Sequence, residues 1–148
     1  MKSLFKVLLL VWVFATPFAW ATSDVTAHEE RNYFQFEIPK YETQRQGGQT
    51  VTVYVRYAYQ KGLPESKYVD YRVMRQDILK FMEPTDEYPA NVFWEILATT
   101  MGKDLMQHYP LDGVSVQLVV FDNPRPGTYE PGDHGPIYTI GTIEPLAH

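Results

Sequence analysis

The segment Thr50 to Tyr59 (TVTVYVRYAY) alternates along its whole length, and this constrains the fold more than any other feature of the sequence. One of its faces carries only apolar or aromatic side chains, namely Val51, Val53, Val55 and Tyr57. Such a pattern, rich in β-branched and aromatic residues, is typical of a strand that buries one face. A shorter alternation over residues 32–38 predicts an earlier strand, with three apolar side chains on one side: Phe34, Phe36 and Ile38.

Helical periodicity replaces the alternation in the middle of the chain. A first helix is predicted before Pro84, because apolar side chains recur there at helical spacing: Tyr71, Met74, Ile78, Phe81 and Met82. A second helix is predicted from near Ala90 to just before Pro110. Its apolar stripe consists of Phe93, Leu97, Met101 and Leu105, with Trp94 and Ile96 at the edges.

Two further strands are predicted after the helices, over residues 114–120 and 137–143. The connections have turn-forming compositions: Lys40 to Gln49 is a polar loop, Asp112-Gly113 is a turn, and Asp122 to Pro136 is rich in Pro and Gly. The order is therefore strand, strand, helix, helix, strand, strand. We predict an α+β fold of order ββααββ, in which two helices cover one face of a four-stranded antiparallel sheet.

The other face of the strand at 50–59 carries Tyr54, Arg56 and Ala58. A small domain with this much aromatic surface rarely leaves it bare. We expect this second face of the sheet to be buried in an oligomer or to line a site.

The N-terminus has the three parts of a cleavable secretory signal peptide, predicted over Met1 to Ala21. Two lysines precede the apolar run VLLLVWVF, and Ala19-Trp20-Ala21 is the cleavage site. The apolar run is well short of the about 20 residues that a membrane span needs. We therefore expect a periplasmic or secreted protein with a flexible tail at residues 22–31 and a single domain at residues 32–148.

Composition limits the chemistry of the exported chain. It has no cysteine, which excludes disulfides, thiolate chemistry and a lipid anchor on Cys. Loss of Lys2 and Lys6 with the signal peptide leaves 11 basic residues against 18 acidic ones, a formal charge of −7. An acidic protein of this kind is a poor candidate for binding nucleic acid or an anionic membrane. No further apolar run follows, so no membrane span is expected after cleavage.

Three stretches of the sequence carry recognisable strings. They are Val69 to Met74 (VDYRVM) continuing to Phe81-Met82-Glu83, then Asn91 to Ala98 (NVFWEILA), and finally His108-Tyr109-Pro110 through Val114-Ser115-Val116 to Asn123–Tyr129 (NPRPGTY). In this order and spacing they resemble the dihydroneopterin aldolases and the wider tunnelling-fold group. Gly48-Gln49, at the start of the long strand, is compatible with the same family. The resemblance covers most of residues 32–143 and implies the fold predicted above.

The resemblance implies a site for a pterin or a related heterocycle. Glu95 matches a family glutamate that accepts hydrogen bonds from the amino group and a ring N–H of the pterin, for which a carboxylate has paired acceptors. Tyr71 matches a catalytic tyrosine beside the reacting side chain of the substrate, where a phenol serves as general acid or base. Val69 and Asp70 lie where the family holds the ring through main-chain groups. Family subunits form rings with the site between neighbours, so the resemblance implies a homo-oligomer, and it implies no cofactor and no metal.

The residues alone leave other interpretations open. Glu95 lies away from the apolar stripe of its helix, as a solvated surface carboxylate would. Tyr71 is also compatible with a packed tyrosine at the start of a helix, because the chain contains 11 tyrosines.

Two catalytic positions of the family carry different residues in this chain. The lysine near the end of the third strand falls at Val120 or, with a shift of one residue, at Phe121, and neither side chain can carry a proton. The glutamate before the second strand falls near Gln44, with Glu42 two residues away. These differences weigh against the retro-aldol reaction and leave ring binding through Glu95 open.

Asp133 and His134 stand together in the segment Gly132–Gly135 and invite an acid–base or metal-binding interpretation. No metal-ligand spacing accompanies them. Glycine and proline on both sides favour an exposed turn instead.

Two functions are compatible with the sequence. The first is a dihydroneopterin aldolase or epimerase-like lyase that acts on a pterin or similar heterocycle at a subunit interface. The second is a non-catalytic exported binding or structural protein that keeps only the fold. Export favours a diverged relative, because the folate-pathway aldolases work in the cytosol, where their substrate is made.

Overall fold

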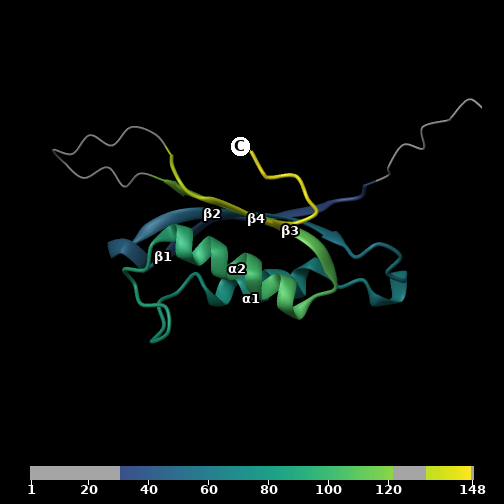
Figure 1. Cartoon of the computed structure of the whole chain (residues 1–148). Coiled ribbons are helices and arrows are strands. Elements are labelled where there is room, and N and C mark those ends of the chain that lie inside the picture. The colour runs from purple at the N-terminus through teal and green to yellow at the C-terminus, as the bar shows by residue number, and fades with distance from the viewer. Residues whose placement is uncertain (1–30, 122–132, 148) are drawn as a thin grey trace, which may run out of the picture.

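The computed structural model describes residues 31–121 and 133–147. Within these residues the chain forms four strands and two α-helices in the predicted order: β1 (Phe34–Thr43), β2 (Gln49–Tyr59), α1 (Tyr71–Lys80), α2 (Trp94–His108), β3 (Leu111–Phe121) and β4 (Ile137–Gly141). Two short 3₁₀ turns, η1 (Arg45–Gly47) and η2 (Glu65–Lys67), lie in the connections. The strands form one antiparallel sheet in the order β1-β2-β3-β4, and both helices lie on one face of it (Figure 1). The predicted α+β fold is thus confirmed.

Several sequence predictions fall outside the described residues. They are the signal peptide over Met1 to Ala21, the tail at residues 22–30, the string Asn123–Tyr129 and most of the loop Asp122 to Pro136.

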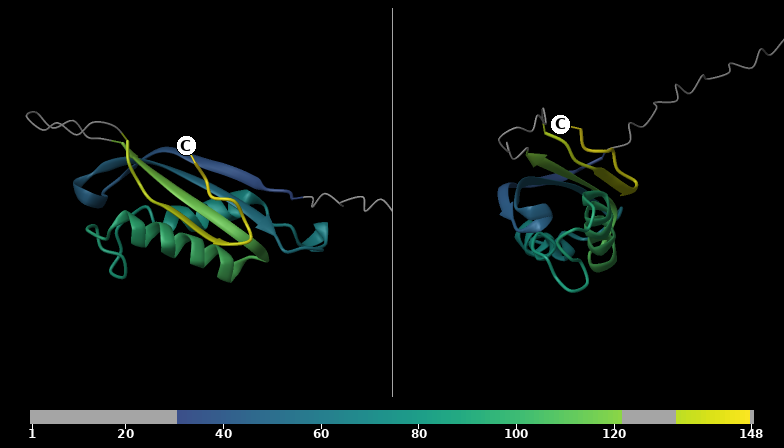
Figure 2. Two further views of the ribbon diagram at one scale, coloured as in Figure 1. Left: turned by 45° about the horizontal axis from the view of Figure 1, so that its top comes forward. Right: turned by 90° about the vertical axis from the view of Figure 1, so that its left-hand side faces the viewer.

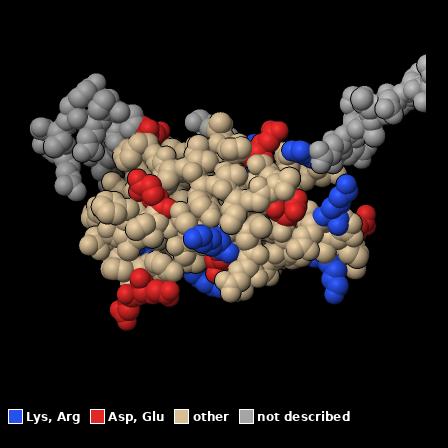
Figure 3. Space-filling model, viewed as in Figure 1, with Lys and Arg blue, Asp and Glu red and all other residues tan. Residues whose placement is uncertain are grey.

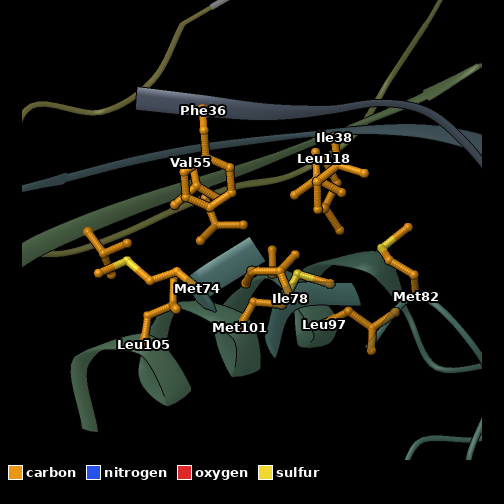
Figure 4. Close-up of a cluster of buried hydrophobic side chains, with 14 of the residues drawn as sticks. Phe36, Ile38, Val55, Met74, Ile78, Met82, Leu97, Met101, Leu105 and Leu118 are labelled. Carbon is orange, nitrogen blue, oxygen red and sulfur yellow. The ribbon is translucent and has the colours of Figure 1, made fainter. Parts of the chain in front are cut away.

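The core lies between the sheet and the helices, as the two periodicities predict. Each strand directs every second side chain toward the helices, and the apolar stripes of α1 and α2 face the sheet. Figure 4 shows the two sets meeting: Phe36, Ile38, Val55 and Leu118 from the sheet, and Met74, Ile78, Met82, Leu97, Met101 and Leu105 from the helical layer. All ten side chains are buried.

The predicted stripe of the second helix is wrong at its first position. Phe93 is 69% exposed, whereas Trp94 is 8% exposed and joins the core. The helix begins at Trp94 and not near Ala90, and Phe93 is its N-cap with extended backbone angles. Helical phase cannot be extended back past a cap, and this is why the side chain of Phe93 leaves the stripe.

Part of one predicted loop and one predicted turn belong to strands. β1 continues past residue 38 through an irregularity, where Lys40 has a φ of 44°, and reaches Thr43. Asp112-Gly113 belongs to β3 and is not a turn, since Gly113 pairs with both Ala58 and Gly141. A Cβ atom on Gly113 would lie 2.9 Å from backbone atoms of Thr142, so glycine there permits close approach of another segment.

That segment, residues 142–147, folds back over the face of the sheet opposite the helices (Figure 2). Leu146 is 1% exposed, and its N–H donates to the hydroxyl of Ser115 at 3.0 Å. Arg56 donates to the carbonyls of Glu144 and Pro145 at 3.2 and 3.1 Å. We call residues 142–147 the C-terminal strap. Part of the second face, expected to be buried in an oligomer or to line a site, is covered by the chain itself.

Replacement of Gly141, the residue before the strap, should strongly destabilise the protein. Gly141 has a φ of 79°, and a Cβ atom there would lie 2.1 Å from the carbonyl oxygen of Asp112. Gly141→Ala should therefore cost roughly 3 kcal/mol, from backbone strain together with the forced shift of the strap. Gly62→Ala is the matched control, because Gly62 has a φ of 77°, but a Cβ atom added there would meet no described atom within 4 Å apart from its chain neighbours. It should cost about 1 kcal/mol in urea denaturation. Equal losses would show that the strap is not held at Gly141.

Candidate functional site

Glu95 lies on the surface, in the first turn of α2. The positive end of the helix dipole favours a carboxylate at this position. Glu95 lines a shallow groove of about 580 Å³ along the exposed side of α2, together with Tyr88, Thr99 and Lys103. The carboxylate is therefore accessible to a ligand, and both the solvated and the ligand-binding interpretations remain compatible with its position.

Arg45 fixes the path of the chain toward Glu95. Its side chain is completely buried, and its guanidinium donates four hydrogen bonds to main-chain carbonyls of the segment between the helices. The acceptors are Phe81 at 2.9 Å, Glu83 at 2.8 Å, Tyr88 at 3.1 Å and Pro89 at 2.9 Å. A rigid planar fork of donors suits several fixed carbonyls at once. Residues 81–89 are thereby held against the turn between β1 and β2.

Neighbouring side chains complete this clamp. The backbone N–H of Gln46 donates to the carbonyl of Ala90 at 2.9 Å, and its side-chain amide donates to the carbonyl of Val92 at 3.0 Å. Burial lowers the pKa of Arg45, and the carboxylate of Glu83 acts in the opposite direction. The guanidinium stays charged, because its ordinary pKa lies far above neutrality. The start of α2 is thus set by side chains of the β1–β2 turn.

The second predicted group of site residues precedes α1. Asp70 is the N-cap of this helix, and its carboxylate accepts from the backbone N–H of Arg72 at 2.9 Å. It also forms an ion pair with the Arg72 side chain at 2.5 Å. Hydrogen bonds from the Arg72 side chain, followed by the backbone bond, lower the pKa of Asp70 to about 2. The side chain of Asp70 therefore serves the helix start and leaves only its main chain for a ligand.

The main chain of Val69 is held by a tyrosine of β2. The hydroxyl of Tyr59 donates to the carbonyl of Val69 at 2.8 Å and accepts from its N–H at 2.9 Å. The ring of Tyr68 stacks on that of Tyr59 at 4.4 Å between centroids. A heterocycle that used the N–H of Val69 would have to replace the Tyr59 hydroxyl, whereas the carbonyl keeps a second lone pair.

Tyr71 begins α1 and rests on the first strand. Its ring centroid lies 5.4 Å from that of Phe34 and 5.8 Å from that of Phe36. The residue is nevertheless 36% exposed. Tyr71 thus combines the packed position of a structural tyrosine with the accessibility that a catalytic one needs.

Within one copy of the protein, the two groups of predicted site residues lie near opposite ends of strand β2. Glu95 stands near the turn that begins β2, where Gln46 bonds to Val92. Val69 is tied to Tyr59, the last residue of β2. A strand of 11 residues separates these ends by about 30 Å. One chain therefore does not bring Glu95 and Tyr71 to the same small molecule.

Each of these ends also carries exposed apolar side chains. Beside Glu95, Phe93 and Ile96 are strongly exposed, at 69% and 51%. Beside Tyr71, Tyr68 and Phe34 are 53% and 46% exposed. Exposed large apolar side chains are common on contact surfaces, so both ends are candidates for such a surface. We call the end around Glu95 the glutamate half-site and the end around Val69 to Tyr71 the tyrosine half-site.

Val120 and Phe121, the two candidate positions for the lysine of the dihydroneopterin aldolases, have no side chain that can transfer a proton. Val120 is buried in the core beneath the helices, and Phe121, half-buried, points to the other face of the sheet. Gln44 is an exposed N-cap of η1, and Glu42 is exposed on β1.

His134 is exposed, as predicted, but it lies in a β-bridge and not in a turn. Its N–H donates to the carbonyl of Val120 at 3.1 Å, and the N–H of Val120 donates back to His134 at 2.6 Å. This bridge extends the β3–β4 hairpin beyond β4. Across residues 31–121 and 133–147, no three His, Cys, Asp or Glu side chains are grouped to hold a metal ion.

A separate polar cluster joins the two helices. The hydroxyl of Tyr109 donates to the carboxylate of Asp77, and Lys80 forms an ion pair with Asp77 at 2.5 Å. Burial raises the pKa of Tyr109, and its bond to Asp77 adds to this. Burial would raise the pKa of Asp77, but the bonds from Lys80 and Tyr109 bring it below its ordinary value. Each of these three groups has a partner within the cluster, which therefore serves to connect α1 with the end of α2.

Charged side chains are dispersed on the face shown in Figure 3, with basic groups interspersed among acidic ones. That face has no basic patch of the kind that binds nucleic acid. None of the described helices is both long and apolar enough to cross a membrane.

The sequence matches no protein-family model and no curated protein. The fold, in contrast, matches solved structures. A protein from Vibrio cholerae assigned as dihydroneopterin aldolase (FolB) superposes with a TM-score of 0.51 at 15% identity, covering 73% of this chain and 97% of that one. Dihydroneopterin aldolase from Burkholderia thailendensis, bound to guanine, superposes with a TM-score of 0.50 at 16% identity, covering 75% and 93%.

These similarities define a class of fold. The chain has the tunnelling fold, in which an antiparallel sheet carries two helices on one face. Within that class it has the fold of the dihydroneopterin aldolases, as the sequence resemblance implied. At this level of identity the likeness extends to the fold alone.

Sequence reasoning missed Arg45 and Tyr59, the two side chains that fix the half-sites. Arg45 lies in a segment that reads as a polar loop, and Tyr59 is one aromatic residue among several in β2. Neither carries a local signal, because their partners are 36 to 44 and 10 residues away.

Replacement of Arg45 should destabilise the protein far more than replacement of an exposed arginine. Arg45→Lys loses the planar fork and leaves buried carbonyls unpaired, which should cost about 3 kcal/mol or more in urea denaturation. Arg72→Lys, at an exposed ion pair, should scarcely change the midpoint. If Arg45→Lys behaved like Arg72→Lys, the clamp would contribute nothing to stability.

Proposed function

We propose that this protein binds a pterin-like heterocycle between two copies of the chain, without the retro-aldol chemistry of the aldolases. The observation that carries the proposal is that the two half-sites lie near opposite ends of strand β2 within one copy of the protein. Each half-site has the chemistry for one part of a ring ligand. The glutamate half-site has an accessible carboxylate, and the tyrosine half-site has an exposed phenol and a main-chain carbonyl.

Recognition of the ring begins with Glu95. A pterin presents an amino group and a ring N–H side by side, and a carboxylate accepts from both at once. Guanine presents the same pair of donors, and the Burkholderia aldolase of this fold is bound to guanine. The exposed Phe93 and Ile96 flank Glu95 and supply apolar surface for a flat ring or for the neighbouring chain.

Association of copies completes the site. The two half-sites are different surfaces, so contact between them is head-to-tail and closes into a ring when the rotation permits. β1 and β4 are the outermost strands of the sheet, and each presents an edge that can pair with another copy. A homo-oligomer therefore supports both the burial of the apolar ends and the construction of the site.

The chemistry is expected to stop at binding. Proton transfer in the retro-aldol step needs a group that ionises near the substrate side chain. Val120 and Phe121 occupy the positions where the family has its lysine. Glu42 is exposed on β1, while its neighbours Tyr41 and Thr43 bond to the segment that joins the helices. Glu42 thus points to the face of the sheet away from the helices.

Loss of the Glu95 carboxylate should abolish most of the binding. We expect the chain lacking residues 1–21 to bind 7,8-dihydroneopterin or guanine in calorimetry, and Glu95→Ala to weaken this about 100-fold, since two charge-assisted hydrogen bonds are lost. Glu37→Ala, at an exposed carboxylate on β1, should bind normally. Glycolaldehyde should not be released from 7,8-dihydroneopterin. Its release would establish a lyase instead. If neither ring bound, the fold would be the only property shared with the aldolases.

A mixing experiment tests the shared site directly. Tyr71→Ala and Glu95→Ala, each defective alone, should recover about a quarter of the binding sites when equal amounts are unfolded and refolded together, because random neighbours then combine two intact half-sites. Light scattering should show an oligomer throughout. A monomer, or no recovery on mixing, would contradict an intersubunit site.

Export forms part of the proposal. The signal peptide over Met1 to Ala21 would place the binding protein in the periplasm or outside the cell, apart from the cytosolic supply of pterins used by a pathway enzyme. Expression of the full chain in a bacterial host should yield a protein whose N-terminal sequence begins at Thr22. Substitution of Ala19 and Ala21 by Leu should block this processing. Recovery of the wild-type chain with residues 1–21 attached and in the cytosol would refute export.

A further inference from the structure

A second hollow, of about 510 Å³, lies on the face of the sheet opposite the helices. Its lining includes Tyr54, Gln117, Phe121, Asp133, His134 and Ile137. Tyr54, Gln117 and Ile137 are direct partners across β2, β3 and β4, so their side chains form one row on this face. The hollow therefore has a floor supplied by the sheet itself.

One wall of this hollow is held in place by the backbone. The N–H of Leu118 donates to the carbonyl of Pro136 at 3.0 Å, and Val120 bonds to His134 in both directions. Gly135 makes this possible, because a Cβ atom there would lie 1.8 Å from the carbonyl oxygen of Leu118. Residues 133–137 thus stand in a fixed position beside the floor.

Gln117 leaves an acceptor unused at the floor of the hollow. Its side chain is only 5% exposed, yet its Oε1 atom has no hydrogen-bond partner among residues 31–121 and 133–147. A buried amide oxygen without a donor is costly, and native proteins rarely keep one without a reason. The oxygen needs an N–H or O–H group, and a small molecule in the hollow that Gln117 lines can supply one.

The rest of the lining defines the class of ligand. Tyr54 and Phe121 offer aromatic surface to a flat ring, and Ile137 adds apolar surface. Asp133 contributes a carboxylate, a further acceptor that favours donors and positive charge. The formal charge of −7 after signal cleavage acts in the same direction.

We propose that this hollow is a second binding site, specific for a small planar molecule that carries N–H donors, such as an amidine or an amino-substituted ring. The Oε1 atom of Gln117 accepts from the donor edge, and Tyr54 and Phe121 hold the ring. The site lies on the opposite side of the sheet from α2 and Glu95, so it is independent of the half-sites. It neighbours the C-terminal strap, because the strap is anchored at Ser115 and Arg56, each two residues from the floor of the hollow, but no strap residue belongs to its described lining.

Benzamidine is a suitable probe, because it joins a flat ring to a donor-rich cationic edge. In ¹H–¹⁵N correlation spectra of the chain lacking residues 1–21, it should shift the amide signals of Tyr54, Gln117 and Ile137. Gln117→Leu, which keeps the volume but removes the acceptor, should weaken binding tenfold or more. Gln117→Glu should strengthen it, since a carboxylate pairs with an amidinium. Benzoate, a flat ring that carries acceptors, should not bind.

Matched variants test whether benzamidine binds at Gln117 or elsewhere on the surface. Gln60→Leu removes an exposed glutamine just beyond β2 and should bind benzamidine normally. Without ligand, Gln117→Leu should melt at a higher temperature than the wild type, because the unpaired buried oxygen is gone. Unchanged affinity in Gln117→Leu, equal binding of benzoate, or shifts confined to residues near Glu95 would each overturn the proposal.

Discussion

The hydrogen bonds of Arg45 hold the connection between the two helices to the β1–β2 turn, and the position at which α2 begins depends on them. The cation is fully buried and reaches four main-chain carbonyls between residues 81 and 89. A buried charge is tolerated only when its donors are paired, and here fixed carbonyls replace the lost water. The connection between the helices therefore has one path, and α2 must begin where it does. Tyr59 performs the same task at the other end of β2, where its hydroxyl bonds twice to Val69.

These two anchors also explain why the site is divided. Each fixes the start of one helix against one end of β2, and each helix start carries one group of ligand-binding candidates. Since β2 is 11 residues long, the two groups cannot converge within one chain. Convergence needs a second copy, and the apolar side chains exposed at both ends provide a physical reason for copies to associate. In this proposal the ligand-binding site therefore forms only when copies of the chain associate.

The fold was predictable because its periodicities are local. Val51, Val53 and Val55 indicate a strand by alternation alone, and Met74 with Ile78 indicates a helix. The predictions are wrong where contacts with distant segments determine the local structure. Phe93 leaves the stripe because a cap ends the helical phase, and Gly113 joins a strand because it pairs with Ala58. The candidate site was predictable only as a set of residues, because no local pattern reports which end of the sheet a residue occupies. Nor does any pattern reveal that Gln117 is buried with no described partner for its side-chain oxygen.

The packing of β3 suits the residues that stand where the dihydroneopterin aldolases carry a lysine. Val120 pairs with Val51 and faces the helices, where both side chains are buried. A lysine at this position would begin among apolar side chains, where an unpaired ammonium group is costly. Phe121 faces the other way, toward the hollow around Gln117 and away from α2. A lysine there would stand on the side of the sheet opposite Glu95. A lysine suitably placed for aldolase chemistry would therefore require a change in the end of β3, beyond the exchange of one side chain, and this agrees with the proposal of ring binding without cleavage.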